Sequence, residues 1–208
     1  MKKLILSAWL LVLLVACTAK YNIQPTLVRG NQVKDGGLLT KKPCGPPCFF
    51  GITPVITDEE QATKTMEKMP DIFANCKSFD FTSTGGKRGT NCTYVNIGYK
   101  NAVVDLVSFT PSDGISVGQV IDLYGSPNSV SVGIVSLPDS PDRTTMTLFF
   151  DQIQTMIGMG EQSGPQFAVQ PITSVVTVVY LSKNGYEESR NTPTNQKWNG
   201  YGVYTGTR

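Results

Sequence analysis

The chain of 208 residues contains no histidine. Histidine is the commonest general base near neutral pH, the usual partner of a nucleophilic serine or cysteine, and a frequent zinc ligand. Its absence excludes the Ser-His and Cys-His nucleophile pairs and makes most zinc chemistry unavailable. We therefore predict a protein that is not an enzyme and that carries no metal and no cofactor.

Charge is also scarce, because only 16% of the residues are charged while 40% are hydrophobic. With 20 glycines and 13 prolines, this composition favours one globular unit of strands and turns over long helices. The formal net charge is +2, and it falls to zero when a leader that contains Lys2 and Lys3 is removed. A chain without excess positive charge is a poor candidate for binding nucleic acid.

Residues 1–16 have the pattern of a secretory signal peptide: Met1-Lys2-Lys3, then an apolar run from Leu4 to Val15. As a helix this run spans only about 18 Å, which is too short to cross a bilayer. We therefore expect the leader to be cleaved. The protein should be extracytoplasmic.

The tetrad Leu14-Val15-Ala16-Cys17 resembles the lipobox of bacterial lipoproteins. The resemblance implies that the Cys17 sulfur receives a diacylglyceryl group and that the new amine is acylated, often with palmitate, which anchors the protein to the cell membrane or the outer membrane. Two or three acyl chains give stable attachment. The alternative is an ordinary signal peptide that leaves a free or disulfide-bonded Cys17. Residues 17–42 are polar and show no sustained period, so we expect a tether there.

The other four cysteines are Cys44, Cys48, Cys76 and Cys92, an even set in an exported chain. We predict disulfides, and we favour pairing between neighbours in the sequence among the three possible connectivities. A turn-rich segment separates the first two, and the last two flank a predicted hairpin. The alternatives are a redox site, which normally has Cys-x-x-Cys spacing, and a four-thiolate zinc site, which needs reduced cysteines.

Residues 43–183 are predicted to form an α+β domain, with two helices on one face of an antiparallel sheet. Thr57-x-x-Glu60 and Ser116-x-x-Gln119 have capping-box spacing, so helices should start there, the first covering 58–69 and the second ending at Gly125. Strands are expected at 78–82, 92–99, 102–110, 129–137, 144–150, 154–159 and 174–181. Gly-Ile-Thr at 51 and Gly-Ile-Ser at 114 suggest a tandem α-β-β-β duplication with a 63-residue period, as repeats 49–112 and 113–183.

The segment from Gly114 to Pro127 resembles the glycine, Ser/Thr, helix, glycine, x, proline signature of BamE/SmpA-like outer-membrane lipoproteins and of the β-lactamase-inhibitor-protein-like fold. The resemblance implies two helices on an antiparallel sheet and a role in protein contact. The stretch from Pro47 to Pro54, together with Trp198 to Gly202, resembles a group of uncharacterised bacterial lipoproteins.

A polar tail at 184–208 ends in three aromatic residues among glycines: Trp198, Tyr201 and Tyr204. Such residues suit a surface that recognises protein, peptide or carbohydrate. They suit an edge strand packed on the sheet equally well. Overall we expect a membrane-anchored binding or envelope-scaffold module with a protein or cell-wall partner. The alternative is a carboxylate-based hydrolase of the cell envelope, which needs two Asp or Glu side chains that converge in a pocket.

Overall fold

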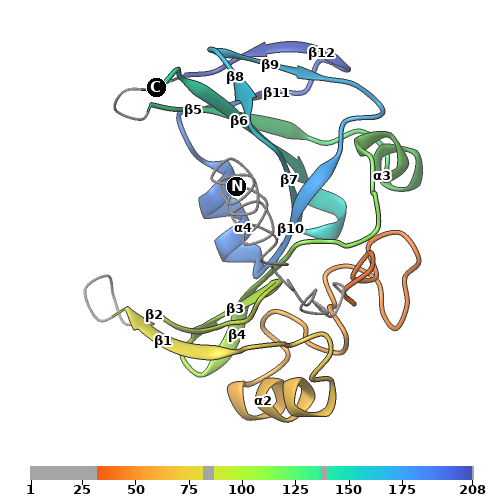
Figure 1. The fold of residues 1–208 in the computed structure, drawn as a ribbon, viewed down its shortest axis with the longest axis vertical. Coiled ribbons are helices and arrows are strands. Elements are labelled where there is room, and N and C mark those ends of the chain that lie inside the picture. Colours follow the sequence, from red (N-terminus) through yellow and green to blue (C-terminus); the bar gives the residue numbers. More distant parts are fainter. Residues whose placement is uncertain (1–31, 82–86, 137–139, 208) are drawn as a thin grey trace, which may run out of the picture. The chain divides into compact units, whose positions relative to one another are not determined.

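The computed structural model describes residues 32–81, 87–136 and 140–207. Within this part of the chain the fold is mainly β with some helices, in agreement with the predicted α+β class (Figure 1). The helices are α2 (Glu59–Lys68), α3 (Val117–Tyr124) and α4 (Lys183–Arg190), with a short 3₁₀ helix η2 at Asp151–Ile153. The predicted signal peptide and the first part of the tether, including Cys17, lie outside the described residues.

A group of strands follows each of the three α-helices along the chain. They are β1 (Lys77–Phe81), β2 (Lys87–Asn91), β3 (Val95–Lys100), β4 (Val103–Phe109), β5 (Ser129–Val135), β6 (Arg143–Phe150), β7 (Thr155–Met159), β8 (Gln162–Ser163), β9 (Gln166–Val169), β10 (Val175–Leu181), β11 (Asn195–Lys197) and β12 (Gly202–Thr205). The strand expected at 92–99 begins later, at Val95, because β2 ends at Asn91 and a bend follows. Strands β2, β8, β9 and β11 were not predicted, whereas β12 lies where the tail was expected to end in an aromatic and glycine-rich strand.

One large antiparallel sheet has the strand order β1-β2-β3-β4-β10-β7-β6-β5-β11, while β12 and β9 form a separate pair. Two meanders, β1 to β4 and β5 to β7, therefore meet at β10. In the ladder Val178 is opposite Phe109 on one side and opposite Ile157 on the other. The late strand β10 is what makes the two meanders one sheet.

Helix α2 begins one residue later than the capping box predicted. Asp58, not Thr57, is the N-cap: its carboxylate accepts the Gln61 N–H at 2.7 Å, and the Gln61 side chain accepts the Asp58 N–H. The Thr57 hydroxyl instead accepts the N–H of Thr53. Both residues have the required polar partner three positions later, and an aspartate caps a helix as well as a threonine does.

Helix α3 begins and ends as predicted. The Ser116 hydroxyl accepts the Gln119 N–H, the Gln119 side chain accepts the Ser116 N–H, and Gly125, with φ of +78°, ends the helix. The two N-caps, Asp58 and Ser116, lie 58 positions apart. The 63-residue spacing of the two Gly-Ile motifs is therefore not the spacing of the helices.

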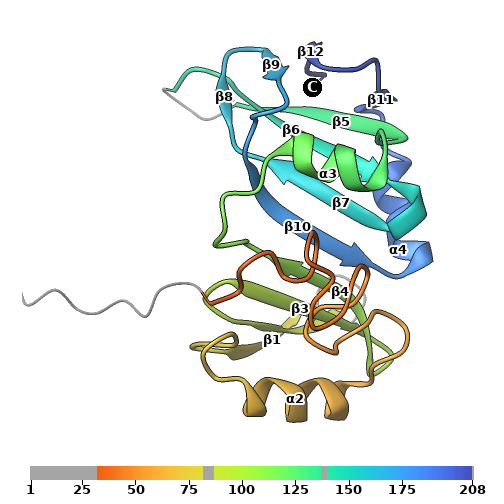
Figure 2. The same cartoon turned by 90° about the vertical axis from the view of Figure 1, so that its right-hand side faces the viewer.

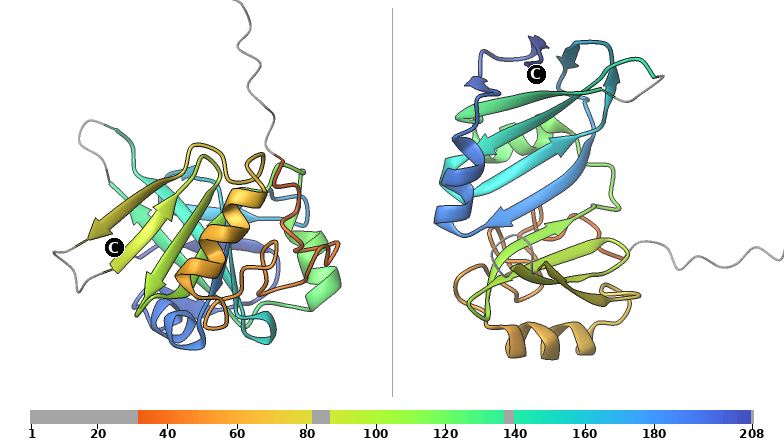
Figure 3. Two further views of the ribbon diagram at one scale, coloured as in Figure 1. Left: turned by 90° about the horizontal axis from the view of Figure 1, so that it is seen from below. Right: turned by 90° about the vertical axis from the view of Figure 1, so that its left-hand side faces the viewer.

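The two faces of the sheet carry different buried clusters. Residues of α2 and α3, including Met66 and Val120, belong to the larger one. Phe149 and Leu181 point to the other face and pack with Tyr186 of α4. Figure 2 shows α3 in front of β5 to β7, and the right-hand view of Figure 3 shows α4 on the opposite face. The sheet therefore carries a helix on the second face that the sequence analysis did not include.

Aromatic rings fill the middle of the larger cluster. The Phe109 ring lies 4.6 Å from Phe49 and 5.4 Å from Tyr180, measured between ring centroids. All three side chains are almost completely buried. Gly36 packs directly on Phe109, where a Cβ atom would overlap the ring, and its φ of +58° also favours glycine.

The folded part begins before residue 43, so the predicted limit of the tether was wrong. Val33 and Leu38 are fully buried in the core. The Tyr124 hydroxyl of α3 donates to the Leu38 carbonyl at 2.5 Å, and the Lys41 amine lies over the Tyr124 ring. Long-range contacts of this kind leave no period in the local sequence, which is why the segment was assigned to the tether.

The predicted pairing of the cysteines is confirmed, because Cys44 bonds to Cys48 and Cys76 to Cys92. The second disulfide joins residues that flank a hairpin of β1 and β2, in which Lys77 lies opposite Asn91. The turn of this hairpin lies outside the described residues.

The predicted polar tail contains a helix that the sequence analysis did not predict. Residues Lys183–Arg190 form α4, and Asp151 holds it from the start of η2. One Asp151 oxygen accepts the Tyr186 hydroxyl at 2.8 Å and the other accepts the Arg190 guanidinium at 2.6 Å. A helix with a single buried side chain is stabilised here by polar contacts to a distant segment, and local sequence patterns do not reveal these contacts.

Candidate interaction surface

The three aromatic residues of the tail lie in and beside the connection from β11 to β12. Tyr204, on β12, is a core residue with 5% exposure. Its hydroxyl donates to the Gly200 carbonyl at 2.7 Å and accepts the Asn199 N–H at 2.9 Å. Tyr204 is therefore not available as a surface contact, which corrects its assignment as a candidate binding residue. Its role is to hold the connection between the strands in place.

Trp198 lies between the core and the surface. Its ring stacks on Tyr204 at 5.7 Å with an interplanar angle of 12°, and the side chain is partly buried against the main core. Tyr201 belongs to the same aromatic group. Its ring makes a T-shaped contact with Trp198, with 5.8 Å between the ring centroids. Trp198 therefore serves chiefly to support Tyr201.

Tyr201 is the member of the group that faces solvent, with 42% exposure. Partial burial and the negative charge of Asp122 on α3 raise the pKa of its hydroxyl. We define the tail surface as Tyr201 with Asp122. It combines an aromatic ring and a carboxylate.

Replacing Trp198 with alanine should lower the free energy of unfolding by about 3 kcal/mol, because the change removes a large, partly buried ring from its stacking partner. Thermal unfolding of the variant measures the effect. Tyr201→Ala is the matched control, and we expect a loss of about 1 kcal/mol or less from this more exposed ring. Equal melting temperatures for Trp198→Ala and the wild type would show that Trp198 is not a packing residue.

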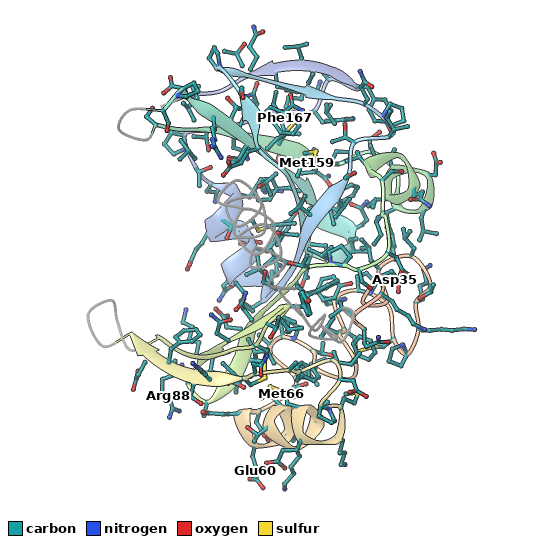
Figure 4. The ribbon with its side chains drawn as sticks, in the orientation of Figure 1. Asp35, Glu60, Met66, Arg88, Met159 and Phe167 are labelled. Carbon is teal, nitrogen blue, oxygen red and sulfur yellow. A yellow bond between two sulfur atoms is a disulfide. The ribbon has the colours of Figure 1, made fainter. Side chains whose placement is uncertain are left out.

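Four acidic residues at α2, namely Asp58, Glu59, Glu60 and Glu67, line one open cavity of about 600 Å³. Glu59 pairs with Arg88 at 2.8 Å and Glu60 with Lys64 at 2.5 Å. Figure 4 places Glu60 on the side of α2 away from the strands. Among the described residues there is also no group of three or more Cys, Asp and Glu side chains placed to hold a metal ion. The two ion pairs and the capping role of Asp58 engage three of the four carboxylates at this cavity.

One motif was missed in the sequence. Gly114-Ile115-Ser116-Val117-Gly118 has the Gly-x-Ser-x-Gly spacing of the nucleophile turn in α/β-hydrolases. Ser116 is nevertheless the N-cap of α3, and its hydroxyl accepts the N–H of Gln119. The chain has no histidine to activate it. The capping role accounts for this serine.

A cavity of about 670 Å³ lies between the first described residues and the end of α2. Asp35 reaches it, but the carboxylate is already occupied: it accepts the N–H groups of Gly37, Leu39 and Thr40 as well as the Thr40 hydroxyl. Burial acts to raise the pKa of Asp35, and these hydrogen bonds outweigh that effect, so the pKa is lowered. Asp35 therefore stabilises the loop that contains Gly37, Leu39 and Thr40, and no motif in the sequence indicated this role.

Comparison of the chain with protein-family models, with curated proteins and with solved structures finds no match. The structure itself contains no helix, within the described residues, that is long and apolar enough to cross a membrane. The function therefore has to be argued from the residues of this chain alone.

Proposed function

We propose that this protein is a lipid-anchored, extracytoplasmic binding module, held to the membrane through Cys17, which contacts a protein partner through the tail surface. The leader and the lipobox-like tetrad support the anchor. The two disulfides suit an oxidising compartment outside the cytoplasm. The anchor would also hold the module close to a partner on the same membrane.

The observation that supports the binding role is that Tyr201 is exposed while its ring packs against another aromatic residue. Trp198 and Tyr204 are packed beneath it, so the ring loses little conformational freedom when a partner covers it. Rigid aromatic residues contribute much of the binding energy in protein interfaces. Asp122 adds a charge that would favour a partner with a basic or hydrogen-bond-donating group at the matching position.

We also infer an internal duplication of the BamE/SmpA-like kind. It is supported by the order of the elements, since α2 precedes β1 to β4 and α3 precedes β5, β6, β7 and β10. The last strands of the two halves, β4 and β10, are neighbours in the sheet.

The binding role is tested by placing a photo-crosslinking amino acid at position 201 in the anchored protein. We expect irradiation of intact cells to give a discrete higher-mass species that contains this chain. A matched probe replaces Ile172, which is more exposed than Tyr201 and lies on a different loop. Crosslinking that is equal at both positions, or absent at 201, would overturn the proposal.

A further inference from the structure

Another pocket, of about 550 Å³, opens where β4 begins and β10 ends. The turn between β3 and β4, the residue before β7 and the first residues of α4 complete its walls. This volume lies within the range of small-molecule sites. The pocket shares no residue with the tail surface, so a ligand here would be a function beyond the proposed protein contact.

The backbone around this pocket is unusual. Val55, Asn101 and Gln154 all line it, and their φ values are +59°, +54° and +48°. This φ is ordinary for Asn101, in the two-residue turn between β3 and β4, and for Gln154, which ends η2. It is a marked outlier only for Val55, a β-branched residue, and an outlier of this kind costs free energy and is common at functional sites. The Val55 N–H donates to the Val104 carbonyl at 2.8 Å, which fixes the strained residue at the rim with its side chain 65% exposed.

The polar groups of the pocket suit a ligand that carries both negative charge and hydroxyl groups. Lys100 and Lys183 are exposed, and neither belongs to an ion pair within the described residues. Opposite charge is limited to Asp105, whose carboxylate already accepts the Ser182 hydroxyl at 2.6 Å. The two lysines therefore leave the pocket with an excess of positive charge.

Side-chain amides supply the second kind of contact. Asn101 and Asn184 are exposed, and Gln154 is half-buried beside them. An amide both donates and accepts hydrogen bonds, which matches the hydroxyl groups of a sugar. Val55 and Val103 provide an apolar surface for the C–H face of a sugar ring. These amide and apolar groups are less suited to a bare inorganic anion, which would contact only the two lysines.

We propose that this pocket binds a saccharide that carries a carboxylate or phosphate group, with Lys100 and Lys183 contacting the acidic group and the amides contacting the hydroxyls. The test uses the mature chain with Cys17→Ser, uniformly labelled with ¹⁵N, and follows backbone amide signals by NMR. The probes are glucuronate, glucose 6-phosphate, glucose and inorganic phosphate.

We expect glucuronate or glucose 6-phosphate to shift the signals of Lys100, Asn101 and Asn184 in a saturable way. The double variant K100Q/K183Q should weaken this binding about tenfold, since two partly screened ion pairs are lost. The matched control K77Q/K197Q removes the same charge from exposed positions outside the pocket and should bind as the wild type does.

Two results would overturn the assignment to an anionic sugar: glucose binding as well as glucuronate, or inorganic phosphate binding as well as glucose 6-phosphate. Unchanged binding by K100Q/K183Q, or equal loss in K77Q/K197Q, would overturn the assignment of the pocket. The absence of shifts at these residues with both anionic sugars would do the same. None of these results alters the outcome of crosslinking at position 201.

Discussion

Replacing Phe109 with alanine is expected to lower the free energy of unfolding by about 3 to 5 kcal/mol, the usual cost of removing a buried phenyl ring. Phe109 has 1% exposure and lies between Phe49 and Tyr180. It also supports Gly36 in the first described segment. The cavity left by the ring would therefore separate groups from three distant parts of the chain. Thermal unfolding should show a melting temperature about 6 to 20 °C lower.

Two further variants separate this effect from a general response to substitution. Phe109→Leu keeps most of the volume and should lose clearly less stability than Phe109→Ala. Val203→Ala removes an exposed side chain and should change the free energy of unfolding by no more than about 0.5 kcal/mol. If Phe109→Ala and Val203→Ala unfolded at the same temperature, the central role of Phe109 in the core would be wrong.

Replacing Cys17 with serine is expected to move the protein from the membrane fraction to the soluble fraction, or to leave the precursor uncleaved. The proposed lipid is attached to the Cys17 sulfur, and a serine cannot accept it in the same way. Because acyl chains contribute about 0.8 kcal/mol for each buried methylene, loss of the lipid removes nearly all of the membrane affinity. Detergent partitioning and intact mass measure the change.

The control for this experiment keeps the proposed lipid site and removes a disulfide. The double variant Cys44→Ser/Cys48→Ser loses one disulfide but retains Cys17. We expect it to stay in the membrane fraction. If intact mass shows that Cys17→Ser is cleaved and it still partitions into detergent as the wild type does, the protein is not a lipoprotein of this kind.

The elements that could be predicted are those whose signals are local. Ser116 and Gln119 are three residues apart, and their reciprocal hydrogen bonds form within one helical turn. Two overlapping capping boxes at the start of α2 fit the sequence equally well, and so the prediction chose Thr57 where Asp58 is the cap. The even set of cysteines near a hairpin likewise led to the correct pairing.

The elements that could not be predicted depend on partners far along the chain. Val33 and Leu38 are buried because α3 and the centre of the sheet lie over them, and the local sequence is polar. Helix α4 depends on Asp151, which lies more than thirty positions earlier than Tyr186 or Arg190. In the tail, alternation with glycine could not tell the exposed Tyr201 from the buried Tyr204, since hydrogen bonds to the Asn199–Gly200 turn decide which ring points inward.

The central position of β10 determines when the fold can be completed during synthesis. Strand β4 leaves the ribosome well before residues 175–181, and until these residues are made its edge has no neighbour on that side. The same holds for β7. Unpaired edges invite pairing with other chains. A nascent chain of this protein is therefore open to wrong strand pairing until β10 has been made.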